Sequence, residues 1–152
     1  MKYISTLLFA FLLSQTLFAQ QNTYLNPEGI PAGSGYSQVV IAEGSKMVFV
    51  SGQVPVNAEG EIVGKKDFQQ QLTQVFENLK IALAAAGADF NDVVKMNYYI
   101  VNYKAKKHLN VIRDTRKKYL SAENPPASTW AGVQGLYHPD VLIEIEAIAV
   151  LQ

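Results

Sequence analysis

The chain has 152 residues, the length of one ordinary domain with a substantial core. Its 13 Lys and Arg residues balance 13 Asp and Glu residues. This balance argues against nucleic-acid binding, because that binding draws most of its affinity from a basic surface. The absence of cysteine excludes disulfides, a thiol nucleophile and thiolate metal sites.

The first nineteen residues have the plan of a secretory signal peptide. One cation, Lys2, precedes an apolar run centred on Leu7 to Leu13, and the segment ends at Ala19, where we expect cleavage. A membrane anchor is the alternative, but Ser14 interrupts the apolar run well short of the roughly 20 residues that a spanning helix needs. We therefore expect an exported protein, periplasmic or secreted, with a net charge of about −1 and no membrane attachment after cleavage.

Residues 20–34 are expected to form an N-terminal arm and residues 35–152 the folded domain. The arm contains prolines, asparagines and glycines with little periodicity, which indicates extended chain and turns rather than core. Two runs rich in Val and Ile, residues 36–42 and 46–51, flank Glu43-Gly44-Ser45. This pattern predicts two strands joined by a tight turn, a β-hairpin.

Apolar residues at steps of three and four predict a helix over residues 68–86. Asp67 supplies the N-cap, with Gln70 three residues further on, and Gly87 ends the helix. Residues 93–101 are rich in Val, Met, Tyr and Ile, which predicts a strand that is partly buried on both faces.

A second, amphipathic helix should follow Asn102, which can cap it. Its apolar face is sparse and consists of Leu109, Ile112, Tyr119 and Leu120. The pair Pro125-Pro126 cannot continue a helix and ends this segment. Two strands remain, at residues 128–133 and 141–151, and the second of them should be central because it is almost entirely apolar.

The two helices can cover one face of the resulting sheet, which predicts an α+β fold. The other face must also be covered. If Tyr98, Ile100 and Ile143 face away from the helices, the remaining apolar surface is too large for a stable monomer. We therefore expect a symmetric oligomer.

Glu144 and Glu146 lie two residues apart in the last strand, so both project from the same face. Carboxylates in an apolar strand must be paired, hydrated or neutralised, because an isolated buried charge is very costly. One interpretation is a ligand site in a cleft or at a subunit interface. The other is a solvated sheet edge, or a bridge to a lysine of a neighbouring subunit.

A polar and basic stripe follows the second helix at steps of four, three and four residues: Lys106, Asn110, Arg113 and Lys117. It could attract anionic ligands, although residue composition alone favours a solvated helix face. His108 and His138 have no carboxylate at ligand spacing, which indicates surface histidines rather than a metal site. Ser51 precedes Gly52, which would let the backbone approach a ligand closely. It lacks the surroundings of a nucleophile and could equally stabilise a turn.

Four motifs then occur in chain order. They are SGQVPV at residues 51–56, VVK at 93–95, PA at 126–127 and IEIEAIAV at 143–150. Together they resemble the RidA/YjgF family over nearly the whole of residues 36–151. The resemblance implies a chorismate-mutase-like α+β domain, with a mixed β-sheet and two helices on one face. It also implies a homotrimer with three ligand clefts at the subunit interfaces, in agreement with the exposed-sheet argument.

The best-known activity of this family is hydrolysis of reactive enamines and imines to 2-keto acids and ammonia. In members with that activity, an arginine directly after Pro-Ala grips the substrate carboxylate, and a glutamate of the terminal strand positions the attacking water. The resemblance carries four residues onto cleft positions: Tyr36, Ser51, Asn110 and Glu144.

The arginine position does not match, because Ser128 stands there and is followed by Thr129 and Trp130. A bidentate arginine makes two charge-assisted hydrogen bonds, so its loss should weaken imino-acid handling by about one to two orders of magnitude. Arg113 or Lys106 could supply an anion contact instead. Serine and threonine at this position would suit a neutral or hydroxylated ligand.

Three functions follow from this pattern. The first is a deaminase or related hydrolase that uses no metal or cofactor, in which Glu144 orients water and backbone amides near Ser128 hold the ligand. The dehydratases that generate imines normally work in the cytoplasm. Export therefore counts against a role in clearing the imines that these enzymes make.

The second function is a trimer that binds a small metabolite without turnover. Trp130 and Tyr36 would then supply apolar contact, and hydroxyls would supply polar contact, from Ser51, Ser128 and Thr129. The third is an endoribonuclease-like activity. The near-neutral charge argues against it, and the basic clusters at residues 104–107 and 113–118 make it testable.

Overall fold

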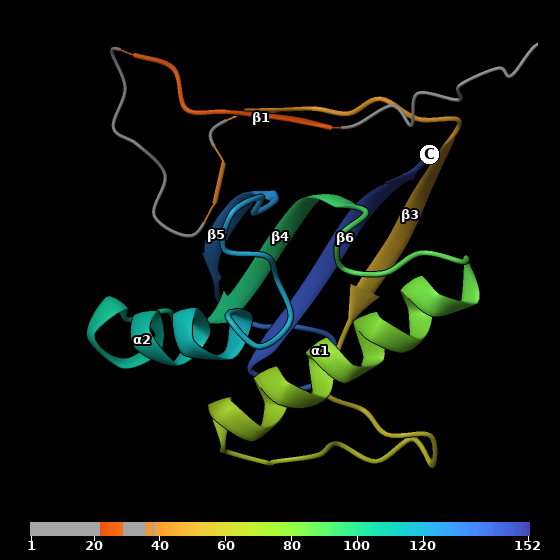
Figure 1. Ribbon diagram of the computed structural model, residues 1–152. Coiled ribbons are helices and arrows are strands. Elements are labelled where there is room, and N and C mark those ends of the chain that lie inside the picture. The colour runs from red at the N-terminus through yellow and green to blue at the C-terminus, as the bar shows by residue number, and fades with distance from the viewer. Residues whose placement is uncertain (1–21, 29–35, 38) are drawn as a thin grey trace, which may run out of the picture.

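The computed structural model describes residues 22–28, 36–37 and 39–152 (Figure 1). The signal peptide expected at residues 1–19 lies outside these ranges. The described elements, in chain order, are β1 (Thr23–Leu25), β2 (Val39–Ile41), β3 (Lys46–Gln53), α1 (Phe68–Ala85), β4 (Val93–Val101), α2 (Ala105–Arg116), β5 (Ala127–Val133) and β6 (Ile143–Leu151).

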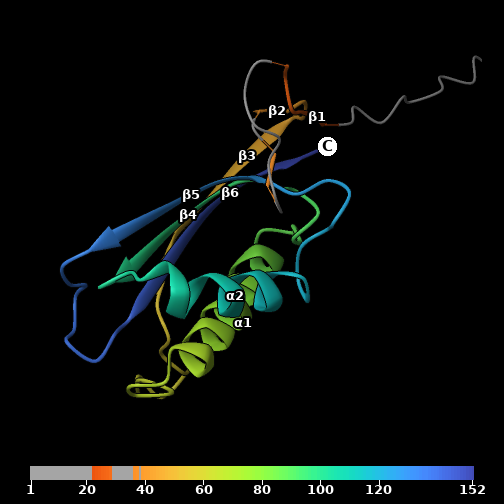
Figure 2. The ribbon, with the colours of Figure 1, turned by 90° about the vertical axis from the view of Figure 1, so that its left-hand side faces the viewer.

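Four strands form one mixed sheet in the order β3-β6-β4-β5. The pair β4 and β5 is parallel, because α2 carries the chain back between them, and the other pairs are antiparallel. Both helices lie on the same face of this sheet (Figure 2). The prediction of an α+β fold with two helices on one face of a mixed sheet is confirmed, and so is the central position of the last strand.

Helix α1 forms where the sequence predicts it. The Asp67 side chain accepts a hydrogen bond from the Gln70 backbone N–H at 3.0 Å, and Gly87 takes a φ of 76° just beyond the helix. Its apolar stripe is buried against the sheet and includes Phe68, Leu72, Val75, Phe76, Leu79 and Leu83. The periodicity that predicts the helix therefore also builds most of its contact with the core.

The predicted hairpin between the second and third strands is wrong. Strand β2 pairs antiparallel with β1, which lies within the expected N-terminal arm. Strand β3 pairs with β6. The chain before β3 is fixed to the end of β6, since the Ser45 N–H donates to the Leu151 carbonyl at 2.9 Å. A Cβ at Gly44 would collide with that same carbonyl oxygen. Strand β3 thus pairs with a strand that is distant in sequence, and β2 pairs with β1.

Helix α2 differs from its prediction at the cap and on its buried face. It begins at Ala105, and Asn102 does not cap it. Instead, the His108 ring accepts a hydrogen bond from the Lys104 backbone N–H at 3.0 Å through Nδ1. His108 is only 4% exposed, so its interpretation as a surface histidine is wrong. The other buried residues of the helix are Ile112, Thr115 and Arg116.

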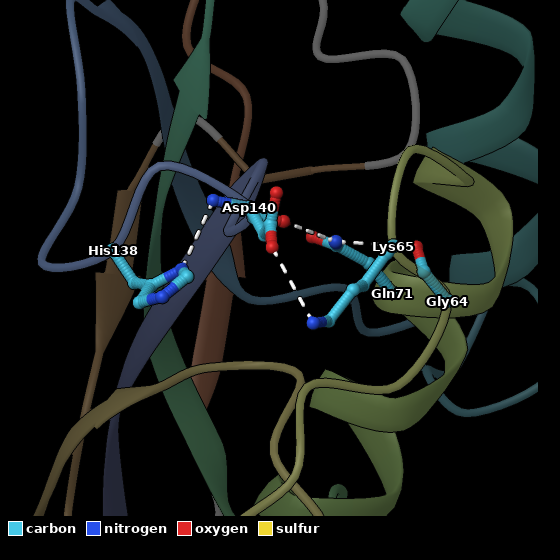
Figure 3. A network of polar contacts seen from close by, with 5 residues as sticks. All are labelled: Gly64, Lys65, Gln71, His138 and Asp140. Carbon is cyan, nitrogen blue, oxygen red and sulfur yellow. Dashed lines mark hydrogen bonds and ion pairs between the residues drawn. The ribbon is translucent and has the colours of Figure 1, made fainter.

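A buried glutamine of α1 holds the loop that leads into β6 (Figure 3). The Gln71 amide nitrogen donates to the carbonyls of Asp140 and Gly64, at 2.7 and 3.2 Å, and its oxygen accepts from the Leu142 N–H at 2.7 Å. In the same loop His138 accepts from the Asp140 N–H through Nδ1 at 3.1 Å. This network fixes the start of the central strand against the helix layer.

The two faces of the sheet differ in exposure. Tyr98, Ile100 and Ile143 are fully buried in the core under the helices. The condition under which they would leave an apolar surface uncovered is therefore not met. The large apolar side chains left exposed on β3 are Met47 at 63% and Phe49 at 70%. Within the described part of the chain, neither helix combines the length and apolarity that crossing a bilayer requires.

Candidate active site

Glu144 lies on the face of β6 that the helices do not cover, opposite Tyr99 of β4. The register between β3 and β6 shifts between Val50 and Gln53, so the chain is irregular beside this carboxylate. A Cβ at Gly52 would collide with the Glu144 carboxylate oxygen. Gly52 therefore provides the space that the carboxylate occupies, whereas the sequence predicts that it makes room for a ligand.

The two glutamates of β6 share a face, as predicted, but their surroundings differ. One carboxylate oxygen of Glu146 accepts hydrogen bonds from the Asn97 amide at 2.7 Å and the Tyr99 hydroxyl at 2.9 Å. The Glu144 side chain has no hydrogen-bond partner among the described residues. Partial burial, followed by the nearby charge of Glu146, raises the pKa of the Glu144 carboxyl. Glu146 is thus a fixed acceptor, and Glu144 is the carboxylate available to bind water or a proton.

Other polar groups surround this pair on the uncovered face. Alternation along β3 puts Ser51 on the same side as Phe49, and Ser51 is exposed. Thr129 of β5 lies in the row of Asn97 and Glu146, and its hydroxyl accepts from the Lys95 ammonium at 2.7 Å. The uncovered face therefore carries three of the predicted site residues, Ser51, Thr129 and Glu144.

Ser128 and Trp130 lie on the opposite face, toward α2. Both lie beside Arg116, which is 5% exposed. Arg116 is not among the predicted site residues. Its guanidinium carbon lies 5.4 Å from the ring centroid of Tyr98 and 5.7 Å from that of Trp130. The guanidinium donates to the Ser128 hydroxyl oxygen at 3.3 Å. The sequence signal for Arg116 is its place in the buried line of α2, four residues after Ile112.

The remaining predicted residues lie elsewhere. Lys106, Asn110 and Arg113 are exposed on α2, as expected for a solvated helix face. Tyr36 is half-buried. The next residue, Ser37, forms a parallel bridge to Ala127, so Tyr36 lies just before the start of β5, beside Pro126.

The predicted residues thus form two groups. Ser51, Thr129 and Glu144 lie on the uncovered face, and Tyr36, Ser128 and Trp130 lie at the start of β5 or under α2. The sheet of one chain separates the groups. Within the residues that the structure describes, no three His, Asp or Glu side chains come together in a way that could hold a metal ion.

Known proteins match both the sequence and the fold. The family model described as Endoribonuclease L-PSP matches residues 28–151. A RutC family protein of Pyrococcus abyssi is 41% identical over 117 residues, which are 75% of this chain and 84% of that protein. A protein of Dermatophagoides farinae named 2-iminobutanoate/2-iminopropanoate deaminase is 32% identical over 117 residues, which are 77% of this chain and 86% of that protein.

Solved structures agree. A Rid-family protein of unknown function from Yersinia pestis superposes with a TM-score of 0.80 at 37% identity, and covers 87% of this chain and 100% of its own. RidA from the Antarctic bacterium Psychrobacter sp. has a TM-score of 0.62 at 30% identity, with coverage of 87% and 100%. The chain therefore belongs to the RidA/YjgF family.

Proposed function

We propose that this chain is an exported hydrolase of small imine or enamine metabolites, a RidA-like deaminase that works as a homotrimer. The observation that carries the proposal is the Glu144 carboxylate, which lies against Gly52 with no hydrogen-bond partner among the described residues and with a raised pKa. Such a carboxylate can accept a proton from a water molecule near neutral pH.

The chemistry is a balanced hydrolysis. The oxygen of a water molecule held by Glu144 attacks the carbon of the C=N bond while the carboxylate takes a proton from that water. That proton then passes to the nitrogen, which gives a carbinolamine. The carboxylate next moves the hydroxyl proton of the carbinolamine to the nitrogen, so that the C=O double bond forms as the C–N bond breaks and ammonia leaves. A 2-imino acid and one water become a 2-keto acid and ammonia, and Glu144 returns to its ionised form.

The site requires a second copy of the chain, because the sheet separates its two groups of residues. A neighbouring subunit can bring its Ser128 and Trp130 to the uncovered face that carries Glu144. The exposed Met47 and Phe49 on that face favour such an association. A homotrimer is the assembly that membership of the family favours.

Arg116 compensates in part for the missing arginine after Pro-Ala. It donates to the Ser128 oxygen, which leaves the hydroxyl hydrogen of Ser128 to be donated to a substrate carboxylate. The competing contact from this hydroxyl to the Pro126 carbonyl is long, at 3.5 Å. Positive charge thus acts through Ser128, which predicts weaker carboxylate binding than a direct arginine provides.

The test is ammonia release from freshly generated 2-iminobutyrate by the processed protein, whose N-terminal residue is expected to be Gln20. Glu144→Gln should lower kcat/KM by about 100-fold, because it removes the proton acceptor. The matched control is Glu146→Gln, which alters the neighbouring carboxylate on the same strand and should cost less than about tenfold. Equal losses in the two variants would refute the role of Glu144.

Binding of a metabolite without turnover is the second candidate, favoured by Ser128 at the arginine position. Tyr36 and Trp130 then provide apolar contact and Ser128 a polar one. Saturable binding of 2-oxobutyrate, with no ammonia release from 2-iminobutyrate by the wild-type protein, would establish this function in place of the first.

Endoribonuclease-like activity is the third candidate, because the matching family model carries that description. The surface that could attract RNA is the exposed stripe of Lys106, Arg113 and Lys117 on α2. RNA cleavage should disappear when these residues are changed to alanine. Cleavage that persists in the triple variant would exclude this electrostatic route.

A further inference from the structure

A pocket of about 200 Å³ lies at the N-terminal end of α2, apart from the residues assigned to hydrolysis. Phe68 and Leu142 form part of its apolar wall. Its polar wall consists of Asn102, Lys104, Lys107 and His108. Neither Glu144 nor Ser128 lines the pocket, so its function is independent of the proposed hydrolase.

His108 is the most informative residue of this pocket. Only 4% of its surface is exposed, and its ring packs against Phe68 with 4.5 Å between the ring centroids. Nδ1 is occupied by the Lys104 backbone N–H. Burial, and then the charges of Lys107 and Lys104, lower the pKa of His108, so the ring is neutral at pH 7 and carries its proton on Nε2.

The Nε2–H group has no hydrogen-bond partner among the described residues. It is also not sealed from solvent, because the one fully buried side-chain nitrogen or oxygen without a partner in the described part of the chain is the Thr115 hydroxyl. The ring lines the pocket and its Nδ1 is occupied, so Nε2–H is the hydrogen-bond donor that His108 has available there.

The start of α2 adds further positive charge. The first backbone N–H groups of a helix lack intrahelical acceptors and carry the positive end of the helix dipole. In α2 the N–H groups of Lys104 and Lys107 are already bonded, to the His108 ring and to the Lys104 carbonyl, so the dipole acts here as a field only. The first turn contains no acidic residue. Lys104 and Lys107 are both exposed, and they lie where a helix normally prefers negative charge. An anion from outside the chain would relieve this arrangement.

We propose that this pocket binds a small oxyanion, a carboxylate or phosphate group, between the Nε2–H of His108 and the ammonium groups of Lys104 and Lys107. An imidazole N–H and lysine ammonium groups all donate hydrogen bonds to such a group. The apolar wall from Phe68 and Leu142 admits a short aliphatic chain attached to it.

The test uses the NMR signals of the two histidine rings, with inorganic phosphate and acetate titrated separately into the full protein at constant ionic strength set with chloride. The His108 signals should shift saturably with a Kd of about 1 mM or tighter, while those of His138, which does not line the pocket, stay unchanged. Saturation by one probe alone identifies the oxyanion class. No saturable shift of His108 up to about 20 mM of either probe overturns the proposal.

Variants separate a built site from general attraction to a basic surface. Lys104→Gln combined with Lys107→Gln should raise the Kd by about tenfold, and both positions are exposed, so the fold is preserved. The control is Lys118→Gln, an exposed charge change just beyond α2, which should leave the Kd unchanged. Equal affinities in the double variant and the wild type would overturn the proposal. Glu144→Gln should leave the Kd unchanged, which distinguishes this pocket from the hydrolase site.

Discussion

The two faces of the four-stranded sheet have different composition and different functions. The covered face is mostly apolar under α1 and α2, with Tyr98, Ile100 and Ile143 fully buried. The uncovered face mixes exposed apolar side chains on β3 with the Glu144 and Glu146 carboxylates on β6. Both faces belong to the same strands, because alternate residues of a strand point to opposite sides.

This difference between the two faces shows how one strand can contribute both to the core and to a polar site. On β6, the residues at odd numbers from Ile143 to Ala149 bury apolar surface and hold the domain together. The residues between them are only partly buried and carry the acidic groups. We therefore expect substitutions on the covered face to act on folding, and substitutions on the uncovered face to act on assembly and activity.

The largest expected effect comes from the same change made on each side. Phe76→Ala removes a fully buried ring of α1 and should lower the free energy of unfolding by about 3–5 kcal/mol. Phe49→Ala removes an exposed ring and should weaken self-association, with a change in the unfolding free energy of the separated chain below about 1 kcal/mol. Urea unfolding and sedimentation measure the two quantities. Loss of folding by both variants would erase the distinction between the faces.

A smaller effect is expected where the helix layer holds the start of β6. Gln71→Leu keeps the volume but deletes three hydrogen bonds, and it leaves the Leu142 N–H and the Asp140 carbonyl unpaired. The unfolding free energy should fall by about 2–3 kcal/mol. Gln69→Leu, an exposed change in the same turn of α1, is the control and should have little effect. Similar stability of the two variants would contradict the anchoring role of Gln71.

The smallest effect concerns pH and isolates the uncovered face. Because the pKa of Glu144 is raised in the folded state, the folded chain holds more protons than the unfolded chain between the ordinary and the raised pKa. The stability of the wild type relative to Glu144→Gln should therefore fall as pH rises through this window, by less than about 1 kcal/mol given solvent screening. Urea unfolding of both proteins from pH 4 to pH 8 measures the difference. A difference that grows with pH in the opposite direction would show that Glu144 is stabilised as an anion.

Local patterns predict the parts of the fold that depend on local interactions. The helix at α1 and the strands β4 and β6 follow from long periodic apolar runs with clear caps. The shared face of Glu144 and Glu146 follows from the two-residue period of a strand.

The failures share a physical cause, which is a partner distant in sequence. Strand β3 pairs with β6 rather than with the preceding strand. His108 is buried because Phe68, 40 positions earlier in the printed sequence, packs against its ring at a tilt of 37°. Arg116 is buried beside two aromatic rings, Tyr98 of β4 and Trp130 of β5. The sequence of α2 alone contains no partner for His108 or Arg116, so it predicts an amphipathic helix without showing that these two residues are buried.

The contact between Gly52 and Glu144 makes the reactive carboxylate depend on a residue with no functional group. A single extra methyl at position 52 would fill the room that the carboxylate occupies and push the glutamate out of its position. In a search for catalysts within this family, the glycine beside the terminal strand is thus as informative as the acid itself. A homologue that keeps the acid but carries a bulkier residue there would need a different backbone path to place the same oxygen atoms.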